Sequence, residues 1–298
     1  MRRRMSALLA GTAATAAILV IAASSTGGSG AHPAQRVTLM SAGPQAAPAA
    51  LPDPLTELQK RAKRAASEAQ KRGADISLTV LDRSTGRVVN SGDTAAFPIA
   101  SVAKLFIADD LLKQVAQKKA TLTAQDRRGL EVMLRSSDDF PADDFWVRGG
   151  GNAVIQRVSD RYTLAKTTAP YNGDWWNTMS TTADLVRYYD MLLDGTGGLP
   201  REQADLILAN LAASTPLGID GYPQRFGIPD GLFAEPVAVK QGWMCCWGPD
   251  NQVHLSTGVV GPDRRYIIAV ASMQPADEAN ARSTLTQAIK TMFPGGRI

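Results

Sequence analysis

The stretch FPIASVAKLFI, residues 97–107, decides the interpretation of this chain of 298 residues. It holds Ser101 and Lys104, which form the only Ser-x-x-Lys pair in the sequence. The apolar residues around this pair predict a helix from about Ser101 to Gln117. Because residues three apart lie on one face of a helix, the two side chains are expected to meet.

A reactive pair and a structural pair both fit this spacing. At the start of a helix, unpaired backbone N–H groups and the positive end of the helix dipole stabilise an anion developing on Ser101. Burial among apolar neighbours lowers the pKa of a lysine, so Lys104 can serve as the base that activates the serine. Taken alone, the pair also fits a serine N-cap followed by a solvated lysine.

Two further short motifs follow. In Ser136-Ser137-Asp138-Asp139, Ser137 is suited to relay a proton and Asp139 to reach Lys104, although a solvated helix cap has the same sequence. Lys240-Gln241-Gly242 ends an apolar strand, where a lysine followed by a glycine suits a carboxylate-binding edge or a plain strand end.

Strand-like segments lie at both ends of the chain, and helical segments lie between them. The expected strands are Ile76–Leu81, Arg87–Asn90, Val237–Gln241, Val253–Val260 and Tyr266–Met273. We predict an α/β (α+β) fold in which these strands form one antiparallel sheet, flanked by helices Pro54–Arg72 and Ala276–Met292. The sheet lobe is expected to comprise residues 54–100 and 214–298, with an inserted all-helical lobe at 101–213 and a ligand cleft between the lobes.

Residues 1–53 have a different composition. Residues 1–30 begin with three arginines, continue with an apolar run and end with small residues, which is the order of a signal peptide; an uncleaved N-terminal anchor is the alternative. Residues 31–53 are rich in Ala and Pro and are expected to form a linker. We therefore expect an exported protein that is secreted, periplasmic or associated with the cell envelope. Membrane contact is expected only through the N-terminal segment, if it is uncleaved.

Charge and histidine content exclude several classes. The net charge of +4 comes from four arginines among residues 1–52, and the rest of the chain carries equal numbers of basic and acidic side chains. Such a balanced body lacks the basic surface of a nucleic-acid-binding protein. His254 is the only histidine after His32, so a Ser-His-acid triad would depend on it alone. No Cys/His cluster has metal-ligand spacing, and no metal site is predicted.

Taken in order, the three motifs resemble the signature of penicillin-binding proteins and class A β-lactamases. The resemblance extends to Leu81–Gly86, which is similar to the early strand pair of that family, and to Thr178–Thr181, which is similar to the start of the helix after the Ω-loop. It covers about residues 54–293 and implies the same two-lobe fold. It implies no metal or organic cofactor.

The resemblance also assigns roles. Ser101 would be the acyl nucleophile, Lys104 its base, and Ser137 the proton donor to the leaving nitrogen. The backbone N–H groups of Ser101 and Trp243 would form the oxyanion hole. The substrate would be a β-lactam or the D-Ala-D-Ala end of a cell-wall peptide. The residues expected to contact it are Asp139, Lys240, Gln241 and Gly242.

Three departures from the family pattern weaken the expected catalysis. Asp139 stands where the family prefers Asn, and Gln241 replaces a Thr or Ser that helps to hold the substrate carboxylate. The deacylating glutamate would fall near Leu164, but residues 161–173 contain no carboxylate. We therefore expect acylation of Ser101 by a β-lactam with slow deacylation. The alternatives are a D-alanyl-D-alanine carboxypeptidase-like enzyme, or a catalytically decayed module that binds the cell wall or a partner protein.

Two other features lie near these motifs. Cys245 and Cys246 are adjacent, so they would form a strained, easily reduced disulfide or remain two thiols on opposite faces of a strand. Trp175 and Trp176, together with Trp146 and Tyr171, would line a binding rim or pack a loop.

Overall fold

The three-dimensional structure is a computed structural model that describes residues 54–92 and 95–298. The expected signal peptide or anchor at 1–30 and the linker at 31–53 lie outside the described residues. Among the helices of the described part, none combines the length and the apolar character needed to span a bilayer.

A five-stranded antiparallel sheet joins the two ends of the chain, as the sequence pattern predicts. Its order is β2-β1-β7-β6-β5, so the early hairpin is hydrogen-bonded to the late strands through β7. The strands are β1 (Asp75–Asp82), β2 (Arg87–Asn90), β5 (Val237–Trp247), β6 (Asn251–Val260) and β7 (Tyr266–Gln274).

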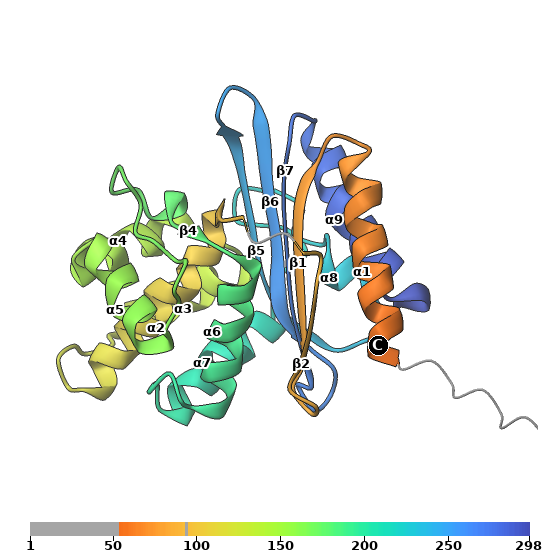
Figure 1. Cartoon of the computed structure of the whole chain (residues 1–298). Helices are drawn as coiled ribbons and strands as arrows, with labels where there is room; N and C mark the ends of the chain where they lie inside the picture. The colour runs from red at the N-terminus through yellow and green to blue at the C-terminus, as the bar shows by residue number, and fades with distance from the viewer. Residues whose placement is uncertain (1–53, 93–94) are drawn as a thin grey trace, which may run out of the picture. The chain divides into compact units, whose positions relative to one another are not determined.

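Alternation along β7 shows why both sheet faces are covered. Ile267, Ala269 and Ala271 belong to one buried apolar cluster, and Ile268 and Val270 belong to the other. Successive side chains of a strand point to opposite faces, so each face has its own apolar layer. The second cluster packs against α1 (Pro54–Gln70), α8 (Ile228–Gly231) and α9 (Glu278–Met292), on the side that carries both terminal helices in Figure 1.

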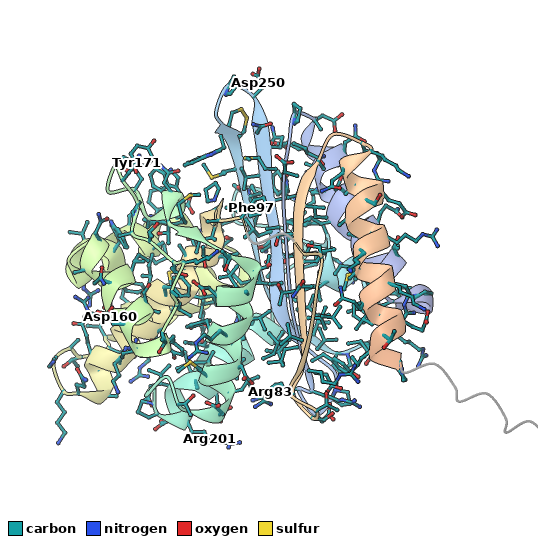
Figure 2. The ribbon with its side chains drawn as sticks, in the orientation of Figure 1. Arg83, Phe97, Asp160, Tyr171, Arg201 and Asp250 are labelled. Carbon is teal, nitrogen blue, oxygen red and sulfur yellow. A yellow bond between two sulfur atoms is a disulfide. The ribbon has the colours of Figure 1, made fainter. Side chains whose placement is uncertain are left out.

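The opposite face of the sheet carries the inserted helices (Figure 1). They are α2 (Lys104–Ala116), α3 (Ala124–Arg135), α4 (Asp139–Gly149), α5 (Asn152–Tyr162), α6 (Thr182–Asp194) and α7 (Arg201–Ala212). Helix α6 contacts β1, β6 and β7 directly. A small ladder of β3 (Phe97–Pro98) and β4 (Met179–Ser180) lies beside the junction, and Figure 2 shows Phe97 between the helices and the sheet.

Two boundaries differ from the sequence-based prediction by more than two residues. The helix expected to begin at Ser101 begins as a 3₁₀ turn, η1 (Ala100–Ala103), and becomes α-helical only at Lys104. Strand β5 continues past Gln241 to Trp247, because it stays paired with β6 as far as Trp247, with a register shift after Met244.

Candidate active site

The Ser-x-x-Lys pair lies at the centre of the site. Ser101 is buried in η1, and Lys104 Nζ lies 3.0 Å from Ser101 Oγ at the first turn of α2. Ala100, just before the serine, has a φ of 45°, a left-handed conformation that is strained for a residue with a Cβ. Strained backbone of this kind concentrates at functional sites, where surrounding contacts hold it.

Lys104 is fully enclosed and strongly coordinated. Its Nζ lies 2.5 Å from the carbonyl oxygen of Ser137 and 2.5 Å from Asp139 Oδ1. Burial lowers the pKa of Lys104 below its usual value, and the negative charge of Asp139 acts against this shift. The predicted meeting of Ser101, Lys104 and Asp139 therefore occurs, and it makes the lysine a titratable neighbour of the serine.

Ser137 connects Lys104 to Lys240. It lies between α3 and α4 with a φ of 60°, a second strained position in the same site. Its hydroxyl accepts a hydrogen bond from Lys240 Nζ at 2.8 Å and lies 3.3 Å from Lys104 Nζ. Burial, with the charge of Lys104 as a smaller cause, holds the pKa of Lys240 well below its usual value. Three proton-carrying groups thus form a continuous chain behind Ser101.

Gly242 allows β5 to approach the nucleophile. A Cβ on this residue would lie 2.7 Å from the carbonyl oxygen of Ile99 and 3.1 Å from Val102, closer than side chains pack. The side chain of Gln241 points away from this contact and donates to the backbone carbonyls of Gln224 and Phe226. The structure therefore does not bring Gln241 to the substrate side of the strand, in contrast to its predicted contact with substrate.

Trp243 follows Gly242 on β5. This strand is at the edge of the sheet, so alternate backbone N–H groups on it have no partner strand. The indole stacks on Tyr222, with ring centres 4.7 Å apart and planes within 8°. The site thus contains a fixed aromatic wall as well as a strand edge near Ser101.

A cavity of about 190 Å³ opens at these residues. Of the predicted site residues, its lining includes Ser101, Ser137, Asp139 and Trp243. The side chains of Lys104 and Lys240 are 0% and 1% exposed, and they stand behind this surface. A larger cavity of about 460 Å³ lies among helices of the inserted lobe, but no serine or cysteine lines it.

Other residues that line the cavity have no single role predicted from the sequence. Trp175 and Trp176 line the cavity, and the Trp175 ring centre lies 4.9 Å from Lys104 Nζ. The Trp175 indole N–H also donates a hydrogen bond to the Asp143 carboxylate. This side chain therefore fixes its own loop and also forms part of the cavity wall. Asp220 and Met244 belong to no sequence motif, and only the tertiary structure brings them to the cavity. No residue of 161–173 lines the cavity, consistent with the missing carboxylate.

Cysteine and histidine positions complete the site. Cys245 and Cys246 form a disulfide, and Cys245 lines the cavity. His254 lies opposite Trp243 on β6, outside the cavity lining, with its Nε2 2.6 Å from the Tyr222 hydroxyl. Burial lowers the pKa of His254 to about 3. The imidazole is therefore neutral and removed from Ser101, so a Ser-His-acid triad does not form.

Several known proteins are similar to this chain. The model of the Beta-lactamase enzyme family matches residues 57–128, a stretch that includes Ser101 and Lys104. Proteins named "Putative lipoprotein LppW" from Mycobacterium tuberculosis and Mycobacterium bovis are 60% identical over 256 residues. The match covers 86% of this chain and 81% of theirs.

Solved structures agree on the fold. A protein described as PBP-A has a TM-score of 0.66 at 20% identity, with 80% of this chain and 95% of that chain covered. A β-lactamase from Chitinophaga pinensis has a TM-score of 0.63 at 16% identity, covering 79% and 98%. A class A β-lactamase from Mycobacterium abscessus has a TM-score of 0.61 at 18% identity, covering 78% and 97%. The chain therefore has the fold of serine β-lactamases and penicillin-binding proteins and belongs to the family of the mycobacterial LppW proteins.

Proposed function

We propose that this protein forms an acyl-enzyme on Ser101 with a β-lactam or a related amide carbonyl, and that it releases the acyl group slowly. The observation that carries the proposal is the 3.0 Å contact of Ser101 Oγ with Lys104 Nζ, a lysine whose pKa is lowered by burial. A lysine that loses its proton near neutral pH is a base matched to a serine nucleophile.

The acylation step follows from the chain of hydroxyl and amine groups. Neutral Lys104 accepts the Ser101 proton as Oγ attacks the carbonyl carbon, and the backbone N–H groups of Ser101 and Trp243 stabilise the oxyanion. The proton then passes from Lys104 to Ser137, 3.3 Å away, as the Ser137 hydroxyl proton moves to the leaving nitrogen. The carbon–nitrogen bond breaks, and the acyl group stays on Ser101.

Slow deacylation is proposed because residues 161–173 contain no carboxylate to activate water, and the neighbouring Asp174 does not line the cavity. Trp175 lies over Lys104 instead, and an indole cannot accept a proton. Loss of a general base typically slows a step by about 10²–10⁴-fold.

The experiment is an acylation assay on the purified full chain with benzylpenicillin, followed by intact mass. We expect an adduct that persists for many minutes, and none with Ser101→Ala. Ser67→Ala, an exposed serine on α1, is the matched control. Drug consumed with no lasting adduct would contradict slow deacylation, and an adduct that survives Ser101→Ala would contradict the nucleophile.

A binding module is the second candidate function. The 2.5 Å contact of Lys104 with Asp139 favours it, because a carboxylate beside the lysine holds the proton that a base must release. Intact drug and no adduct in the same assay would support this candidate.

We propose that the protein is exported to the cell envelope. The signal-like residues 1–30 and the name of the LppW relatives support this location. Residues 1–53 contain no cysteine, so lipid attachment through an N-terminal cysteine is not part of the proposal. Fractionation of cells that produce the full chain tests it, and recovery with the cytoplasmic fraction would contradict it.

A further inference from the structure

The cavity has an unusual charge arrangement for an enzyme acting on carboxylate-bearing substrates. Within the described residues, its lining includes two carboxylates, Asp139 and Asp220, and no lysine, arginine or histidine. The two lysines of the site stand behind the surface with their Nζ atoms engaged by Ser101, Ser137, Asp139 and the Gln241 carbonyl. The surface that a substrate meets is therefore negative.

The two carboxylates are not equivalent. Asp139 is already engaged by Lys104 Nζ. Asp220 accepts the backbone N–H of Tyr222, and its charge acts on Lys104 only at longer range, because no salt bridge of the described residues includes Asp220. Its charge is therefore available to a ligand.

Asp220 is held beside an aromatic surface. A Cβ on Gly218 would lie 2.5 Å from Asp220 Oδ1 and 3.3 Å from the Trp243 ring, so the bare glycine lets the carboxylate and the indole approach one another. Trp176, also in the lining, is partly exposed. The Trp243 indole has one face covered by Tyr222 and Lys240 Nζ 6.0 Å from its ring centre, so Trp176 is the indole that offers a face to a ligand. An indole face attracts organic cations such as quaternary ammonium groups.

The location of Asp220 indicates which part of a substrate it meets. Its loop is fastened to the Ser137 side of the cavity, because the Ile219 N–H donates to the Ser136 carbonyl and the Thr215 hydroxyl donates to Ser136 Oγ. In the proposed function, Ser137 protonates the leaving group. The inference rests on that assignment.

We propose that the leaving portion of the substrate carries an ammonium group that is seated between the Asp220 carboxylate and the indole of Trp176. A leaving group with a carboxylate, as in D-alanine or a penicillin, meets a negative surface here and finds no hydroxyl at Gln241, so benzylpenicillin is expected to acylate Ser101 more slowly than a cationic substrate does. The substrate class is an amide or ester of a cationic amine or alcohol.

Three thioacetates with equal spacing test the proposal: acetylthiocholine, its uncharged isostere S-(3,3-dimethylbutyl) thioacetate, and S-acetyl-3-mercaptopropanoate. Acylation of Ser101 in the full chain is followed by intact mass and by thiol release. We expect rates to fall in that order, with the cation favoured over its isostere by about fivefold to tenfold, a ratio typical of a partly desolvated cation–π contact and ion pair. Equal rates for the cation and its isostere would overturn the proposal.

Asp220→Asn is the decisive variant, because asparagine keeps the acceptor for the Tyr222 N–H and removes only the charge. The preference for the cation is expected to fall to about twofold or less. Asp230→Asn, an exposed aspartate on α8, is the control and should keep the wild-type ratio. An unchanged ratio in Asp220→Asn would assign the selectivity to another group and overturn the proposal.

A binding measurement separates this inference from the proposed chemistry. Choline and 3,3-dimethylbutanol are isosteric, and quenching of tryptophan fluorescence reports their affinities without any reaction. Tighter choline binding that Asp220→Asn abolishes would support the cation site even if Ser101 proved unreactive toward penicillin. Equal affinity for both compounds would overturn it even if Ser101 proved reactive.

Discussion

Ser101 and Lys104 illustrate what residue spacing can predict. The i, i+3 interval places the two groups in contact whether the turn is 3₁₀ or α, and the apolar neighbours ensure that the lysine is buried. The effect of Asp139 on Lys104 also follows from its charge. Asp220 was not predictable, because it lies in a loop without a motif and 116 positions from Lys104 in a sequence of 298.

Asp139→Asn should shift the acidic limb of the acylation rate to lower pH. The Asp139 charge raises the pKa of Lys104, so its removal lets the lysine lose its proton at a lower pH. The pH dependence of penicillin acylation measures this. Asp144→Asn, one turn farther along α4 and paired with Arg148, is the control. A shift of the limb to higher pH would show that Lys104 is not the base.

At the scale of elements, the site depends on the close approach of the edge strand β5 to the turn η1. Gly242→Ala should abolish acylation and lower stability by about 1–3 kcal/mol, because the added Cβ meets the backbone of Ile99 and pushes the strand from Ser101. Chemical denaturation and the penicillin assay measure the two effects. Wild-type acylation in this variant would mean that the oxyanion contact does not come from β5.

The start of α3 offers a test of stability that is independent of the site. Thr123 and Asp126 form a capping box, and Arg148 also binds Asp126. Arg148 is the largest cause that lowers the pKa of Asp126 to about 2 from its usual 3.8. The stabilisation of the folded state by the charged Asp126 carboxylate is therefore fully present above pH 4 and is lost as the pH falls through about 2. Asp126→Asn should cost about 1–2 kcal/mol at pH 7, with the difference from wild type shrinking below pH 4 in denaturation curves. A difference that stays constant with pH would contradict this origin.

At the scale of the whole molecule, the inserted helices are tied to the sheet beneath the site. The Tyr189 hydroxyl on α6 lies 3.0 Å from that of Thr257 on β6, which donates to the carbonyl of Lys240 on β5. Tyr189→Phe should lower stability by about 1 kcal/mol, because the buried Thr257 loses one partner. Acylation should stay within about twofold of wild type, because the Thr257 bond to Lys240 remains. A large loss of acylation with no loss of stability would contradict this description.

The sequence by itself determined the elements and the reactive pair. Short apolar runs bounded by turns mark the strands, apolar periodicity marks the covering helices, and the three ordered motifs identify Ser101, Lys104, Ser137 and Lys240. These signals are local, because hydrophobic pattern and turn chemistry act over a few residues. Only the tertiary structure decided which groups form the cavity surface. Contacts of η1 with β5 and with the turn Trp175–Asn177, and the hydrogen bond from Ile219 to Ser136, bring Trp243, Trp175 and Asp220 around the serine. Gln241 turns away from it, and the lysines stand behind the cavity wall. Such an arrangement depends on contacts between distant segments, which no local pattern encodes.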